Sequence, residues 1–107
     1  MSEDLMKKIQ KQIDENKILL YMKGTREMPQ CGFSSRVVQL LNSYKVRYET
    51  VDVLSDPELR QALKEFSNWP TFPQLYVKGQ LIGGCDICVE MDQNGELEPL
   101  VKSAVGG

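Results

Sequence analysis

Residues 18–44 read ILLYMKGTREMPQCGFSSRVVQLLNSY, and this stretch decides the fold. It opens with an apolar run at residues 18–22, which is typical of a strand covered on both faces. A polar loop at residues 24–30 separates this strand from residues 31–44, where apolar side chains recur at helical spacing. Cys31 is therefore predicted to lie at a strand–loop–helix junction, on the first turn of a helix.

The position of Cys31 predicts a reactive thiol. The N-terminus of a helix carries partial positive charge and free N–H groups, and both stabilise a thiolate. The alternative is a buried, inert cysteine, which is the common state of free cysteines but is disfavoured at a helix start. A redox C-x-x-C motif would hold a second cysteine at position 34, where this chain has Ser34. Chemistry at Cys31 must therefore take its second sulfur from elsewhere.

The composition indicates one globular domain. A chain of 107 residues can bury a modest core, and its apolar and charged fractions, 41% and 26%, are ordinary for such a domain. The net charge is -2 and the lysines and arginines are scattered, which argues against a nucleic-acid or membrane partner. The longest apolar run is far too short to span a bilayer.

The cysteine and histidine counts narrow the chemistry and the compartment. Three cysteines argue against a disulfide framework and for a reducing compartment. The acidic N-terminus does not resemble a secretory signal, so we expect a cytoplasmic protein, or one of the mitochondrial matrix if a presequence has been removed. The chain has no histidine, which removes the Cys–His nucleophile pair and most zinc sites.

The remaining segments predict alternating helices and strands. Helices are expected at residues 2–16 with Ser2 as the cap, at 57–66 after Asp56-Pro57-Glu58, from an Asp86 cap through 91, and at 97–105. Strands are expected at 47–53, and at 74–77 and 80–82 as a hairpin about Lys78-Gly79. Helical connections imply parallel pairing, whereas the hairpin is antiparallel. The predicted fold class is therefore α/β, a mixed four-stranded sheet flanked by helices on both faces, which is the thioredoxin-like arrangement.

Several motifs besides Cys31-Gly32-Phe33-Ser34 point to one family. They are Tyr21-Met22-Lys23-Gly24, Pro29, Asn68-Trp69-Pro70-Thr71-Phe72-Pro73-Gln74-Leu75 and Gly83-Gly84-Cys85-Asp86-Ile87. In this order they cover nearly the whole chain, which resembles the monothiol glutaredoxins of the Cys-Gly-Phe-Ser type in their single-domain form. The resemblance implies one glutaredoxin domain over residues 1–107. Cys88 departs from the family, in which this position is usually filled without a thiol.

The resemblance also implies a cofactor and partners. An Fe–S cluster normally needs four thiolate-type ligands, and Cys31 supplies one. The family's solution is a [2Fe-2S] cluster that bridges a homodimer, with each iron held by Cys31 and by one bound glutathione. The implied role is cluster transfer and biogenesis and iron homeostasis. The implied partners are BolA-type proteins and iron–sulfur acceptor proteins.

Two loops are predicted to form the glutathione site. Thr71-Phe72-Pro73 is similar to the cis-proline segment of the fold, and a cis bond would present the Phe72 backbone to glutathione as to an added strand. An ordinary trans proline is the alternative. Gly84 allows close backbone approach, and the helix after it offers N–H groups to a carboxylate.

Charged side chains are predicted to complete the site. The resemblance makes Lys23 and Arg60 glutathione contacts, although each also fits the pattern of a solvated surface cation. Asp86 is predicted to cap its helix and to meet the amino group of the ligand, with capping alone as the alternative. Cys85 is placed beside the pocket, where family geometry implies a disulfide with Cys31 under oxidation.

Other readings remain open for the cysteines and for the function. Cys85 and Cys88 have C-x-x-C spacing, but three cysteines without histidine cannot complete a structural zinc site. The alternative functions are a glutathione-dependent thiol–disulfide oxidoreductase that removes glutathione from proteins, and a non-catalytic interaction module. We expect at most weak oxidoreductase activity beside the carrier role.

Overall fold

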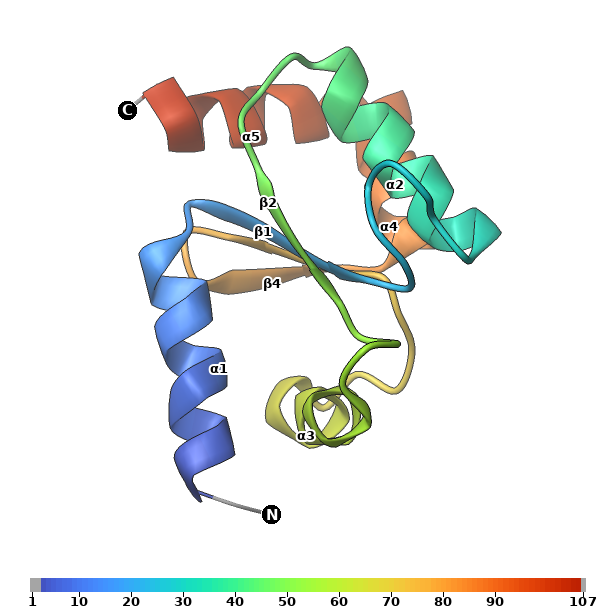
Figure 1. The fold of residues 1–107 in the computed structure, drawn as a ribbon. Coiled ribbons are helices and arrows are strands. Elements are labelled where there is room, and N and C mark those ends of the chain that lie inside the picture. Colours follow the sequence, from blue (N-terminus) through green and yellow to red (C-terminus); the bar gives the residue numbers. More distant parts are fainter. Residues whose placement is uncertain (1–2, 107) are drawn as a thin grey trace.

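The computed structural model describes residues 3–106, and its elements follow the predicted order (Figure 1). They are α1 (Glu3–Glu15), β1 (Ile18–Met22), α2 (Gly32–Ser43), β2 (Glu49–Asp52), α3 (Pro57–Ser67), β3 (Gln74–Val77), β4 (Gln80–Gly83), α4 (Cys85–Gln93) and α5 (Leu97–Gly106). The strand predicted at 47–53 is shorter than expected. The predicted cap Ser2 lies outside the described residues.

The strands form a four-stranded mixed sheet within residues 3–106, in the order β2-β1-β3-β4. β1 pairs with β2 in parallel and with β3 antiparallel, and β3 pairs antiparallel with β4. Lys78 and Gly79 turn this hairpin with φ values of 49° and 80°, as a two-residue turn of type I′ requires. The predicted thioredoxin-like sheet is confirmed.

Helices cover both faces of the sheet (Figure 1). α2, α4 and α5 enclose one buried apolar cluster, and α1 and α3 enclose the other. β1 is buried throughout, and successive residues alternate between the clusters: Leu20 and Met22 belong to the first, and Leu19 and Tyr21 to the second. An apolar side chain at every position of β1 is thus explained by its central place between two layers of helices.

Two of the three predicted helix caps lie within the described residues, and one of these two predictions is wrong. Asp56 caps α3 as expected, because its carboxylate accepts a hydrogen bond from the Leu59 N–H at 3.1 Å. Asp86 does not cap α4. The cap is Gly84, in extended backbone, and Asp86 lies inside the first turn. The helix begins earlier because β4 ends at Gly83 and Gly84 leads directly into it, while a carboxylate in the first turn still suits the helix dipole.

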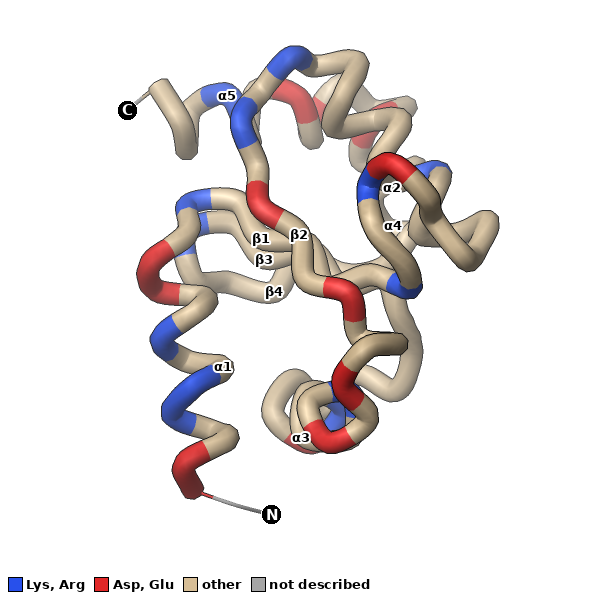
Figure 2. The backbone as a smooth tube through the Cα atoms, in the orientation of Figure 1, with Lys and Arg blue, Asp and Glu red and all other residues tan. Residues whose placement is uncertain are grey.

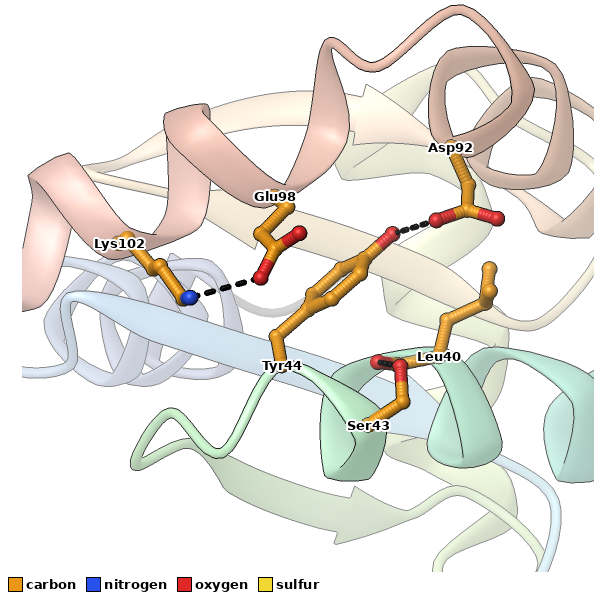
Figure 3. Close-up of polar contacts among 6 residues, drawn as sticks. All are labelled: Leu40, Ser43, Tyr44, Asp92, Glu98 and Lys102. Carbon is orange, nitrogen blue, oxygen red and sulfur yellow. Dashed lines mark hydrogen bonds and ion pairs between the residues drawn. The ribbon is translucent and has the colours of Figure 1, made fainter.

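A hydrogen bond joins the end of α2 to α4. The Tyr44 hydroxyl, just after α2, donates to Asp92 Oδ1 in the last turn of α4 at 2.5 Å (Figure 3). On the neighbouring helix α5, Lys102 forms an ion pair with Glu98 at 2.7 Å. Burial and the hydrogen bond to Asp92 both raise the pKa of Tyr44. The hydrogen bond thus joins the C-terminal ends of α2 and α4.

Charged residues of both signs are interspersed along the backbone, and the first turn of α1 is acidic (Figure 2). Among residues 3–106, no helix combines the length and the apolar character that crossing a membrane requires.

Candidate functional site

Cys31 is the residue immediately before α2, at the rim of a pocket of about 330 Å³. Its backbone is extended, with φ −150° and ψ 134°, and its side chain is half-buried. The predicted residues that line the same pocket are Lys23, Cys31, Thr71, Phe72, Pro73, Gly84, Cys85 and Asp86. β1, α2, the segment before β3 and the start of α4 therefore meet at one place.

The start of α2 stabilises the thiolate of Cys31. The backbone amide of Ser34 lowers the pKa of the Cys31 thiol most, and the Phe33 amide, the charge of Lys23 and the Ser34 hydroxyl lower it further, against a partial opposing effect of burial. This is the effect expected at a helix N-terminus. The predicted activated thiol is therefore supported by its surroundings in the fold.

Ser34 also has a structural role. Its side chain is fully buried, and its Oγ accepts a hydrogen bond from the Lys23 N–H at 3.1 Å. This bond joins the end of β1 to the first turn of α2. The residue in the place of a second redox cysteine thus holds together the two elements that carry Cys31.

The loop between β1 and α2 is closed by its own backbone. Gln30 donates to the Lys23 carbonyl at 2.9 Å, and the Gly24 N–H donates to Asp52 Oδ1 at 2.9 Å. Gly24 has φ +91°, and an added Cβ would lie 2.7 Å from backbone atoms of both Met28 and Gln30. Only glycine fits this backbone. The closed loop therefore holds Cys31 in a fixed position at the pocket.

The opposite wall of the pocket contains the predicted cis-proline segment. The Phe72–Pro73 peptide bond is cis, and Phe72 is buried against the second apolar cluster. Gln74 is fully buried, and its Nε2 donates to the carbonyls of Trp69 and Thr71 at 3.1 and 3.2 Å. Gln74 had no predicted role, yet its amide holds the segment that forms this wall.

The start of α4 forms the third wall. A Cβ at Gly84 would lie 3.2 Å from the Pro73 carbonyl and 3.4 Å from Trp69 Nε1, so this position needs glycine for close packing. Burial raises the pKa of Cys85, and the Asp86 carboxylate raises it further. Burial also raises the pKa of Cys88 to about 12. The three thiols thus differ, and only the pKa of Cys31 is lowered.

Arg60 is the predicted site residue that does not line this pocket. It lies on α3 and is half-buried. Its Nε is buried and has no hydrogen-bond partner within residues 3–106. Its predicted contact with glutathione stays a prediction.

Three lining residues were missed by the site prediction. Phe33, Trp69 and Ile87 also line the pocket. Phe33 is 62% exposed, unusual for so large an apolar side chain, and its place beside Cys31 in the tetrad was the available signal. Trp69 is half-buried, and its indole N–H has no partner in the described part of the chain.

Among residues 3–106, no three side chains of His, Cys, Asp or Glu gather as a metal site. The metal-ligand role predicted for Cys31 stays a prediction.

Sequence comparison decides the family. Residues 18–82 match the family profile of glutaredoxins. A probable monothiol glutaredoxin of Legionella pneumophila, GrlA, is 61% identical over 87 residues, which are 81% of this chain and 98% of that protein. This chain belongs to the glutaredoxin family. With Ser34 in place of a second cysteine, it is a monothiol glutaredoxin, as its sequence relatives are named.

Two solved structures share this glutaredoxin fold. The solution structure of reduced poplar apo GrxS14 is 48% identical, with a TM-score of 0.82, and the match covers 96% of this chain and 94% of that one. The crystal structure of a buckwheat glutaredoxin–glutathione complex is 26% identical, also with a TM-score of 0.82, and the match covers 97% and 96% of the two chains.

We predict that Ser34→Ala raises the pKa of Cys31 modestly and destabilises this glutaredoxin. The substitution removes the hydroxyl that lowers the pKa of Cys31 but keeps the backbone amide, which has the larger effect. It also leaves the Lys23 N–H without its acceptor, at a cost of about 1–2 kcal/mol. Because alkylation requires the thiolate, the curve of rate against pH should move to higher pH. Ser35→Ala, one residue along the helix, is the control, and identical curves for both variants would contradict the role given to Ser34.

Proposed function

We propose that this glutaredoxin binds glutathione beside Cys31, carries a [2Fe-2S] cluster between two chains and passes it to iron–sulfur acceptor proteins. The role belongs to cluster biogenesis and iron homeostasis in a reducing compartment, with BolA-type proteins as partners. The observation that carries the proposal is a single activated thiol on the rim of a pocket whose walls suit glutathione.

The pocket offers complementary groups to each part of glutathione. Lys23 supplies a cation, and the N–H groups at the start of α4 suit a carboxylate. Asp86, exposed in the same turn, suits the amino group. The Phe72 backbone, turned by the cis bond, offers hydrogen-bonding groups to a peptide-like ligand as the edge of a sheet does. The buckwheat glutaredoxin crystallised with glutathione supports this assignment.

The residues present fit a shared cluster and do not fit one held by a single chain. One thiolate per chain leaves the ligand set of a [2Fe-2S] cluster incomplete, and a second chain with two glutathione thiols completes it. When bound, the cluster supplies iron atoms that accept these thiolates. This chain's own part is to present Cys31 as a thiolate and to hold glutathione beside it. Ligands that are not covalently attached also suit a cluster that must be released.

A transfer assay tests the carrier role. The cluster-loaded protein is mixed anaerobically with the apo form of a [2Fe-2S] ferredoxin, and circular dichroism in the visible range follows the cluster. We expect the ferredoxin spectrum to replace that of the glutaredoxin within minutes. An unchanged spectrum, with free iron removed by a chelator in a parallel sample, would contradict cluster transfer.

The lowered pKa of Cys31 also favours a second function, a glutathione-dependent oxidoreductase. In that reaction the thiolate attacks a glutathione mixed disulfide, and free glutathione resolves the product. Turnover of such a disulfide, coupled to glutathione reductase, measures this activity. Rapid turnover without transferable cluster would make the oxidoreductase the main function.

A further inference from the structure

Cys88 has no part in the proposed function, yet its position gives it access to the site through Cys85. Cys88 is fully buried in the apolar cluster beneath α2, α4 and α5. Cys85, the first residue of α4, lines the Cys31 pocket and packs against that same cluster. One thiol of the helix thus faces the reactive cysteine, and the other lies behind it.

We propose that Cys85 and Cys88 form an internal disulfide that takes over the oxidation of Cys31 and returns Cys31 to its free thiol. The oxidant is a glutathione disulfide, which first glutathionylates Cys31. This inference rests on the glutathione chemistry of the proposed function and does not involve the cluster.

Helix geometry permits this disulfide. Residues three apart in an α-helix lie on one face, with Cα atoms about 5 Å apart, inside the range of about 4.4–6.8 Å found for disulfides. Their Cβ atoms, about 5–6 Å apart in a regular helix, must come roughly 1–2 Å closer. The adjustment falls in the first turn of α4, directly after Gly83 and Gly84, whose backbone is the least restricted of any residue type.

The exchange proceeds in two balanced steps. The Cys85 thiolate attacks the Cys31 sulfur of the mixed disulfide, so that a Cys31–Cys85 bond forms and glutathione leaves as its thiol. The Cys88 thiolate then attacks Cys85, so that a Cys85–Cys88 bond forms and Cys31 leaves as a thiolate. The two protons released by Cys85 and Cys88 pass to glutathione and to solvent or Cys31. Overall, two electrons move from Cys85 and Cys88 to the mixed disulfide.

The positions of the three sulfurs favour this direction. Cys85 and Cys88 lie one turn apart at the start of α4, so the second exchange closes within a short segment and frees Cys31. Cys88 is fully buried in the apolar cluster, so its sulfur is out of reach of free glutathione. The second step is slow, because a thiol with a pKa of about 12 is rarely ionised near neutral pH. Cys31 is returned to its free thiol, and the disulfide then lies between Cys85 and the buried Cys88.

Peptide mapping can distinguish every disulfide in the chain. A protease that cleaves before aspartate places Cys31 in fragment 14–51, Cys85 in fragment 56–85 and Cys88 in fragment 86–91. The reduced protein is treated with one equivalent of glutathione disulfide per chain, which is the amount that the two steps consume, then sampled over time, quenched in acid and alkylated before digestion. Mass spectrometry then reads which fragments are linked and whether Cys31 carries glutathione.

We expect fragments 56–85 and 86–91 to be linked at equilibrium, after glutathionylated Cys31 has appeared and declined. In Cys88→Val, the fraction of Cys31 held in any disulfide should rise at least about fivefold, because the second acceptor is missing. Valine is an apolar residue suited to this buried site, and thermal unfolding checks that the variant folds. Cys88→Ser is the second variant and should behave in the same way.

The inference is overturned if Cys88 remains fully alkylatable in wild type while Cys31 takes up glutathione. It is also overturned if wild type and Cys88→Val hold the same fraction of free Cys31. If Cys31 never takes up glutathione, both this inference and the glutathione chemistry of the proposed function fail.

Discussion

Replacing Cys31 by serine should abolish the cluster-bridged dimer and slow the reaction with glutathione disulfide at least about a thousandfold. Cys31 is the residue whose pKa the start of α2 lowers, and the pKa values of Cys85 and Cys88 are raised. A serine hydroxyl is not ionised near neutral pH, so the variant offers neither a nucleophile nor an iron ligand at this position. Stopped-flow kinetics and size exclusion after anaerobic reconstitution measure the two losses.

Cys88→Val is the matched control for this experiment. It removes a thiol from the core and leaves the pocket residues unchanged, so the first reaction of Cys31 and the formation of the dimer should persist. A coloured dimer in Cys31→Ser would show that another residue holds the cluster, and the site described above would then be wrong.

Gly24→Ala should destabilise the protein by about 2–4 kcal/mol. Gly24 has φ +91°, and the new Cβ would lie 2.7 Å from the Gln30 nitrogen and the Met28 carbonyl oxygen, which are backbone atoms that cannot rotate away. Relief requires the loop to open and the bond from Gln30 to the Lys23 carbonyl to lengthen. Because this loop positions Cys31, its reaction with glutathione disulfide should slow as well. Urea unfolding and the same stopped-flow assay measure both effects.

Gly32→Ala provides the comparison for Gly24→Ala. Gly32 is the first residue of α2, and among residues 3–106 no heavy atom beyond its chain neighbours and its own helix backbone lies within 4 Å of an added Cβ. Alanine favours a helix over glycine, so this variant should be at least as stable as wild type. Equal losses of stability in the two variants would show that loop closure at Gly24 is not the cause.

Much of the fold follows from patterns that a local stretch of sequence contains. The apolar run of β1, the Asp56-Pro57 start of α3 and the Lys78-Gly79 turn each depend on a few neighbouring residues, and each is found where it was predicted. The start of α4 is the exception. Asp86 is a good capping residue, but the place where β4 ends makes Gly84 the cap, and strand length depends on pairing across the sheet.

The site was predictable only in part, because some of its features also depend on contacts between segments that are distant in the sequence. Family resemblance identified the cis-proline segment and most of the pocket. Phe33 has a signal in its place beside Cys31, whereas Ile87 joins the lining through the packing of α4 at the pocket. The buried side-chain amide of Gln74 holds the cis-proline wall of the pocket by hydrogen bonds to the carbonyls of Trp69 and Thr71. The hydrophobic periodicity of the sequence gives no sign of these bonds. Arg60 lies on α3, which packs on the face of the sheet that α1 also covers. The sequence pattern around Arg60 is that of a surface cation and does not predict that its Nε is buried.

Anaerobic reconstitution with iron and sulfide, with and without glutathione, tests the central claim most directly. Visible absorption reports the cluster, size exclusion reports the dimer, and chemical analysis of the isolated dimer counts its glutathione. We predict a coloured dimer that forms only with glutathione and contains one glutathione for each chain. A coloured species that forms equally well without glutathione, or a colourless monomer under both conditions, would contradict it.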